Sequence, residues 1–78
     1  MRDNGHVARH VPRADVEPLL AQTQSARARD RARAVSALCP CAVRYNDDRI
    51  WARLFAMTRD TDAAVRRQVV HALADGSP

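Results

Sequence analysis

The sequence of 78 residues contains no lysine, only two glycines and only three aromatic residues. So few large side chains allow one small domain with a thin core, because a chain of this length buries only about 60–65% of its unfolded surface. No apolar run approaches the ~20 residues that span a bilayer, so no membrane association is expected. The polar segment 1–13 lacks the apolar stretch of a secretory signal, and a cytoplasmic location is therefore expected.

Basic charge comes from arginine alone. Thirteen arginines and nine acidic residues give a net charge of +4, and the chain also holds fifteen alanines. Arginine and alanine without lysine are typical of a GC-rich coding sequence, so the arginine excess needs no explanation from binding. Strong basicity is common in proteins that bind nucleic acids or anionic membranes. Here acidic residues are interspersed with the arginines, which favours a mixed, solvated surface.

Cysteine and histidine are too sparse to indicate a metal or cofactor site. Cys39 and Cys41 flank Pro40, a spacing too short for an unstrained disulfide and different from the Cys-x-x-Cys of zinc or thioredoxin-type sites. Two small side chains at a helix end, in a reducing compartment, explain them. His6 and His10 would share a face only on a helix, which nothing favours there, and no third ligand lies at a matching distance. No metal and no cofactor are therefore expected.

The sequence matches itself at a spacing of 35 residues. Residues 35–38 (VSAL) align with 70–73 (VHAL), and Arg31 aligns with Arg66. A period of this size is typical of helical hairpins that stack because none can bury its apolar stripe alone. The sequence therefore predicts an all-α fold of two antiparallel helical hairpins, with a flexible tail at 1–13 and one domain at 14–78. Further aligned residues are Val16, Leu19 and Leu20 with Trp51, Leu54 and Phe55.

Four helices are expected, near residues 15–25, 26–39, 48–59 and 63–74. Asp15 is the predicted N-cap of the first, which places Pro18 in a first turn that tolerates proline. Apolar residues at helical spacing define the inward faces. In the first two helices these are Val16, Leu19, Leu20 and Thr23, then Ala28, Ala32, Ala34, Val35, Leu38 and Cys39. In the last two they are Ile50, Trp51, Leu54, Phe55, Met57 and Thr58, then Val65, Val69, Val70, Ala72 and Leu73.

Residues 60–73 (DTDAAVRRQVVHAL) closely resemble the core of a HEAT repeat, one of the armadillo-like helical families. The shared pattern is an aspartate in the inter-helix turn, Val-Arg opening the second helix, then small apolar residues and Ala-Leu. The resemblance implies that Asp60 and Arg66 belong to a hydrogen-bonded ladder between successive repeats, with Arg31 as the first arginine of that ladder. An arginine partly buried at a repeat junction needs a carboxylate partner.

The resemblance implies a short α-solenoid of two repeats, about 15–40 and 48–76. The first repeat matches only in part, because Ser25 stands where the family has its aspartate, as an N-terminal capping repeat would allow. Two repeats are fewer than the three that a solenoid core usually needs. Either the chain packs against itself or another chain, or it is a fragment of a longer array. An apolar face exposed at the C-terminal end, and self-association through it, are expected.

The function implied by the resemblance is a protein–protein interaction or scaffold module without catalytic activity. HEAT-like proteins bind partners along a concave surface lined by the second helix of each repeat. The outward residues of those helices would form a basic strip suited to an acidic segment of a partner protein. The candidate partner-binding residues are Arg29, Arg33, Arg67 and His71, with Ser36 and Gln68 beside them.

Nucleic-acid binding is the alternative, since some HEAT-like proteins hold DNA on the concave face. The arginines at 27, 29, 31 and 33 alternate, and residues so spaced scatter around a helix rather than forming a stripe. No aromatic residues interleave with them.

Enzymatic activity is the third hypothesis, because some HEAT-like proteins act as bilin lyases. Catalysis requires a nucleophile or an acid–base pair in a pocket. The candidates Cys39, Cys41 and His71 show no mutual orientation in the sequence. Cys39 would lie at a helix C-terminus, where the dipole opposes the thiolate. No enzymatic activity is therefore expected.

Overall fold

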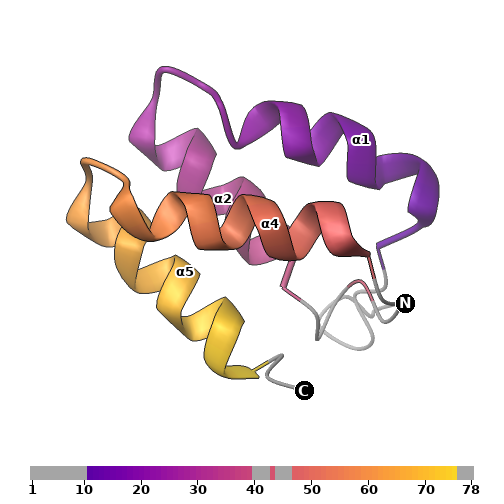
Figure 1. Cartoon of the computed structure of the whole chain (residues 1–78). Coiled ribbons are helices and arrows are strands. Elements are labelled where there is room, and N and C mark those ends of the chain that lie inside the picture. The colour runs from indigo at the N-terminus through magenta and orange to yellow at the C-terminus, as the bar shows by residue number, and fades with distance from the viewer. Residues whose placement is uncertain (1–10, 40–42, 44–46, 76–78) are drawn as a thin grey trace, which may run out of the picture.

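The computed structural model describes residues 11–39, 43 and 47–75 (Figure 1). Over these residues the chain is all-helical and contains no strand, which confirms the all-α part of the predicted fold class. The elements are α1 (Arg13–Gln22), α2 (Ala28–Ala37), α4 (Asp48–Ala56), the 3-10 turn η1 (Met57–Arg59) and α5 (Ala63–Asp75). The predictions that concern His6, His10, Pro40 and Cys41 fall outside the described residues.

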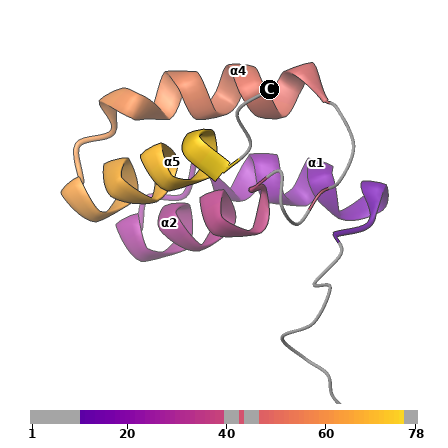
Figure 2. The ribbon, with the colours of Figure 1, turned by 90° about the horizontal axis from the view of Figure 1, so that it is seen from below.

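The helices form two hairpins that lie next to each other. In Figure 1 the turn between α1 and α2 and the turn between η1 and α5 lie at the same end of the molecule, on the left. Helices α1 and α4 run in the same direction in this view. Helix α2 packs along α5, and Figure 2 shows these two helices side by side. Each hairpin therefore supplies one helix to a shared central contact.

Helix α1 begins earlier than predicted. Its N-cap is Pro12, with extended backbone at φ −64° and ψ 152°, rather than Asp15. The Asp15 N–H donates to the Pro12 carbonyl at 2.9 Å. Residues 11–13, expected in the tail, instead belong to the folded part, because Val11 packs against the core. Pro18 consequently lies in the second turn, where its ring removes one intrahelical hydrogen bond on the exposed side of α1.

Helix α2 is shorter than predicted at both ends. Its N-cap is Arg27, and the Ser25 hydroxyl accepts the N–H of Arg27 at 3.1 Å. At its C-terminus the Leu38 N–H is shared between the carbonyls of Ala34 and Val35, at 3.0 and 3.1 Å. Such shared bonding tightens the last turn of a helix and ends it.

The second hairpin follows its predicted boundaries within one residue. Asp47 caps α4, where its side chain accepts the Arg49 N–H at 2.9 Å. Asp62 caps α5 by accepting the N–H groups of Ala64 and Val65 at 2.8 and 3.1 Å. Both aspartates satisfy amide groups that have no partner inside the helix. The predicted range 48–59 is divided between α4 and η1, because the last turn has 3-10 geometry.

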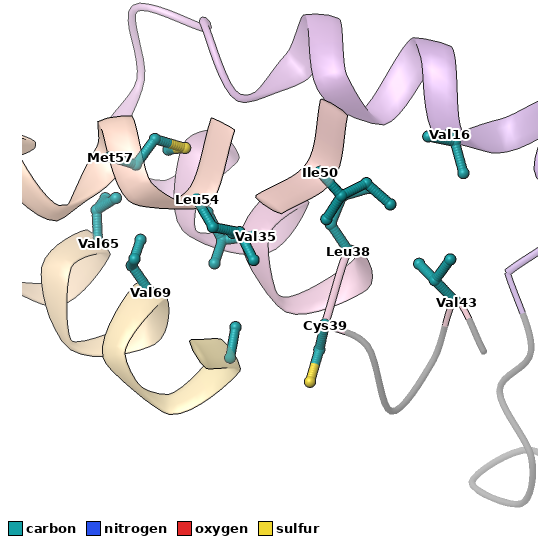
Figure 3. Close-up of a cluster of buried hydrophobic side chains, with 11 residues drawn as sticks. Val16, Val35, Leu38, Cys39, Val43, Ile50, Leu54, Met57, Val65 and Val69 are labelled. Carbon is teal, nitrogen blue, oxygen red and sulfur yellow. The ribbon is translucent and has the colours of Figure 1, made fainter. Parts of the chain in front are cut away.

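One apolar core joins both hairpins (Figure 3). Most of the predicted inward residues lie in it or pack against it, and Val43, from the connection between the hairpins, adds to it. Because the side chains come from all four helices, neither hairpin has a core of its own. The cluster comprises Val16, Val35, Leu38, Cys39, Val43, Ile50, Leu54, Met57, Val65, Val69 and Ala72.

Three predicted inward residues of the second hairpin point to solvent instead. Phe55 and Val70 are 60% and 61% exposed, and Thr58 is exposed as well. On α5 the core contact is made by Val69 and its helical neighbours, and Val70 lies about 100° further around the helix. No other described element covers that side. Two large apolar side chains of the second hairpin are thus exposed, and the inward placement of these three residues is wrong.

Candidate functional site

The three predicted ladder residues meet where the hairpins join. The Asp60 carboxylate accepts two hydrogen bonds from Arg31, Nε to Oδ2 at 2.9 Å and Nη2 to Oδ1 at 3.0 Å. Arg66 Nη1 donates to the Asp60 carbonyl at 2.7 Å. The planar guanidinium of Arg31 matches the carboxylate in bidentate geometry, which makes a strong and oriented contact. Asp60 therefore links α2 to the turn that precedes α5.

Hydrogen bonds of the two hairpin turns repeat at the 35-residue spacing. In the first hairpin Arg31 Nη1 donates to the Ser25 carbonyl at 3.0 Å, as Arg66 does to Asp60 in the second. The Ser25 hydroxyl accepts the backbone N–H two residues later at 3.1 Å, as the Asp60 carboxylate does at 2.9 Å. Ser25 and Asp60 therefore have the same role within their own hairpins. Only Asp60 adds a charge that reaches the neighbouring hairpin.

A second polar contact between the hairpins involves Arg53 of α4. Its Nε donates to the Thr23 hydroxyl oxygen at 2.8 Å, and its Nη2 donates to the Thr23 carbonyl at 3.2 Å. Thr23 is fully buried, so these bonds satisfy atoms that water does not reach. Arg53 is not among the predicted inward residues of its helix, so this role was missed. Thr23 was the available signal, because a hydroxyl on an inward face requires a polar partner.

Arg49 makes a third, weaker contact between the hairpins. Its guanidinium lies 2.9 Å from the Asp47 carboxylate on its own hairpin and 2.6 Å from Glu17 on α1. The hydrogen bond from Arg49 lowers the pKa of Asp47 below its usual value, while burial acts in the opposite direction. Arg49 and Glu17 are largely exposed, and exposed pairs contribute little to stability. The Arg49–Glu17 pair therefore adds little to the stability of the contact between the hairpins.

The Arg31–Asp60 pair sits in a partly dry environment. The exposed fractions of the two side chains are 15% and 10%. The hydrogen bond from Arg31 lowers the pKa of Asp60, helped by the Asp62 N–H and opposed by burial. The same hydrogen bond raises the pKa of Arg31. Both groups are thus held in their charged forms across the neutral range.

Acid should destabilise the fold through these aspartates. Asp60 and Asp47 have lower pKa values folded than unfolded, so their contribution is complete above the unfolded pKa of about 4 and is lost as pH falls through the folded value. We expect the melting temperature, followed by circular dichroism, to fall below about pH 4. Asp60→Asn should flatten this fall. The control Asp48→Asn, at an exposed position whose side chain makes no hydrogen bond or ion pair among the described residues, should retain it. Equal slopes for both variants would contradict the assignment.

The predicted partner-binding residues are all exposed. Arg29 and Arg33 lie on α2, and Arg67 and His71 lie on the neighbouring helix α5. Within the described part of the chain, the three arginines make no hydrogen bond or ion pair. No contact binds them into one cluster, so the structure gives two exposed pairs on adjacent helices. Arg31 is not available beside them, because Asp60 engages it.

Of the three catalytic candidates, Cys39 and His71 lie among the described residues and Cys41 does not. Cys39 is buried just beyond the end of α2, whereas His71 is exposed on α5. Among the described residues, no three histidine, cysteine or acidic side chains are grouped so that they could hold a metal ion. None of the described helices has the length and apolar character needed to cross a membrane.

Comparison with known proteins adds no relative. No protein-family model matches the chain, and neither a curated protein nor a solved structure matches it.

Proposed function

We propose that this protein is a non-catalytic interaction module in which two HEAT-like hairpins, stacked as a short α-solenoid, present a basic surface to another protein in the cytoplasm. The repeated turn hydrogen bonds and the Arg31–Asp60 link between hairpins support the stacking. The observation that carries the binding role is that Arg29, Arg33 and Arg67 are exposed and make no ion pair within the described residues. Guanidinium groups left in this state are ready to take carboxylates from outside.

An acidic protein segment fits this surface better than nucleic acid does. Because Arg31 is engaged by Asp60, the alternating arginines of α2 do not provide a continuous row of cations. Single-stranded nucleic acids also use aromatic side chains as stacking platforms. The described aromatic residues, Trp51 and Phe55, both lie on α4 rather than on α2 or α5. Among the described residues, the arginines therefore lack the aromatic stacking platforms that single-stranded nucleic-acid binders use.

Removing the exposed arginines should weaken binding to an acidic peptide. We expect the triple variant Arg29→Gln, Arg33→Gln, Arg67→Gln to bind a fluorescent glutamate-rich peptide about tenfold more weakly, because three charge-assisted contacts are lost. Anisotropy titrations at two salt concentrations measure this. The control is Arg59→Gln, another exposed arginine without contacts among the described residues, which should leave the affinity unchanged.

The same titrations with duplex DNA test the alternative. Phosphate contacts give a log–log salt slope of about −0.9 per contact. DNA binding that is tighter than peptide binding, with a steep slope that the triple variant flattens, would replace the protein partner by nucleic acid. Equal loss of peptide affinity in Arg59→Gln would show a non-specific charge effect.

A further inference from the structure

The second hairpin exposes the positions that correspond to those by which the first hairpin contacts the second. Val35 of α2 is fully buried in the core shared with the second hairpin (Figure 3), whereas its counterpart 35 residues later, Val70, is exposed. Leu20 is partly buried against the core, and its counterpart Phe55 is exposed. Equivalent positions are thus covered in one hairpin and open in the other. The open face is defined here as Phe55, Thr58, Arg66 and Val70.

Arg66 of the open face makes the same hydrogen bond within its own hairpin as Arg31 makes in the first hairpin. Both donate from Nη1 to the carbonyl six residues earlier, at 2.7 Å for Arg66 and 3.0 Å for Arg31. Arg31 then binds the Asp60 carboxylate through Nε and Nη2. In the described part of the molecule, the same two nitrogens of Arg66 make no hydrogen bond, and the residue is exposed. Arg66 therefore presents a bidentate edge that fits a carboxylate.

Thr58 of the open face corresponds to Thr23 in the same way. Each threonine hydroxyl donates to the carbonyl three residues earlier, Thr58 to Phe55 and Thr23 to Leu20. Arg53 covers Thr23 with two hydrogen bonds, whereas no donor among the described residues reaches Thr58. A guanidinium from outside would complete the equivalent contact.

We propose that the open face binds one further helical hairpin of the α4–α5 type. That hairpin would present an aspartate of its inter-helix turn to Arg66 and an arginine of its first helix to Thr58. Asp60 and Arg53 make these two contacts to the first hairpin. One repeat later, Arg66 is the corresponding open donor and Thr58 is the corresponding open acceptor. The open face shares no residue with the exposed arginines of the proposed partner surface, so either proposal can fail alone.

A second copy of this chain does not supply these contacts. In its first hairpin, the positions 35 residues before Arg53 and Asp60 are Pro18 and Ser25. Proline offers no donor and serine offers no charge, so neither polar contact would form. The Arg53 and Asp60 of a second copy are already engaged inside that copy. This chemistry revises the sequence-based expectation of self-association through the repeat ends.

The test extends the full chain after Pro78 by a second copy of residues 44–78, which keeps the 35-residue register. If the proposal holds, urea unfolding of the extended chain is one cooperative transition at higher urea than that of the parent chain. Arg66→Gln should raise the unfolding equilibrium constant roughly tenfold in the extended chain and less than about twofold in the parent. Replacing the added aspartate that corresponds to Asp60 by asparagine should have the same effect, without adding to Arg66→Gln.

Several results would overturn the proposal. They are a separate transition for the added hairpin, equal effects of Arg66→Gln in both chains, and full additivity of the two substitutions. Arg59→Gln serves as the matched control, with no difference expected between the chains. Should an extended variant fail to fold, Val70→Asp in the otherwise unchanged extended chain gives a second measurement. This substitution should make the added hairpin unfold in a transition of its own, at lower urea than the rest of the chain. A single transition at an unchanged urea midpoint would contradict docking on the open face. Sedimentation of the parent chain should show a monomer, and head-to-tail assembly of copies would overturn the assigned occupant.

Discussion

Leu54→Ala is expected to lower the free energy of unfolding by about 3 kcal/mol. Leu54 is fully buried on α4, in the core that joins both hairpins. Truncating a buried leucine removes its transfer free energy and leaves a cavity that the surroundings fill only in part. A chain of this length has a total stability of roughly 4–12 kcal/mol, so the substitution takes a large share of it.

Urea denaturation followed by circular dichroism measures this loss as a lower midpoint at an unchanged slope. The matched control is the next residue, Phe55→Ala, which removes a larger side chain from an exposed position. We expect it to cost less than about 1 kcal/mol, because exposed substitutions rarely cost more. Equal losses for the two variants would contradict the observed division of α4 into a buried and an open side.

Asp60→Ala is expected to lower the free energy of unfolding by about 2 kcal/mol. The substitution removes both hydrogen bonds from Arg31 and the acceptor of the Asp62 N–H. It also leaves the Arg31 guanidinium without its carboxylate in a partly dry junction. Asp60→Asn separates these effects, because an amide oxygen still accepts the Asp62 N–H but carries no charge.

A double-mutant cycle tests whether the pair joins the hairpins. Once Asp60 is alanine, Arg31→Ala should cost much less than it does in the parent chain, because the two residues act through one contact. Urea midpoints of the four proteins provide the coupling. Additive losses would show that Asp60 acts only within its own turn.

Local hydrogen bonding made the second hairpin predictable. Asp47 and Asp62 are strong capping residues, and a helix start that depends on its own side-chain cap can be read from neighbouring residues. The start of α1 was missed because Val11 gains its place through contact with the core, which no local pattern encodes. The sequence therefore predicts these helix boundaries best where the chain supplies the cap.

The side of a helix that is covered was harder to predict. Periodicity groups Val69 and Val70 on one broad apolar side, yet only a neighbouring element decides which of the two is buried. Arg53 was missed for the opposite reason, since a charged residue is expected at the surface while its long stem reaches inward to Thr23. The Arg31–Asp60 contact, in contrast, was implied by the HEAT resemblance. In that resemblance Asp60 and Arg66 match the family's aspartate and arginine, six residues apart, and Arg31 is the equivalent arginine of the first repeat.

Asp60 has two structural roles, and together they couple the turn before α5 to helix α2. One carboxylate both closes the turn before α5, through the Asp62 N–H, and holds α2 through Arg31. Opening of that turn therefore also breaks the contact between Asp60 and Arg31, so it costs more free energy than the loss of one local hydrogen bond. We therefore expect the two hairpins, which share this carboxylate, to unfold in one cooperative transition, although their sequences are similar to each other.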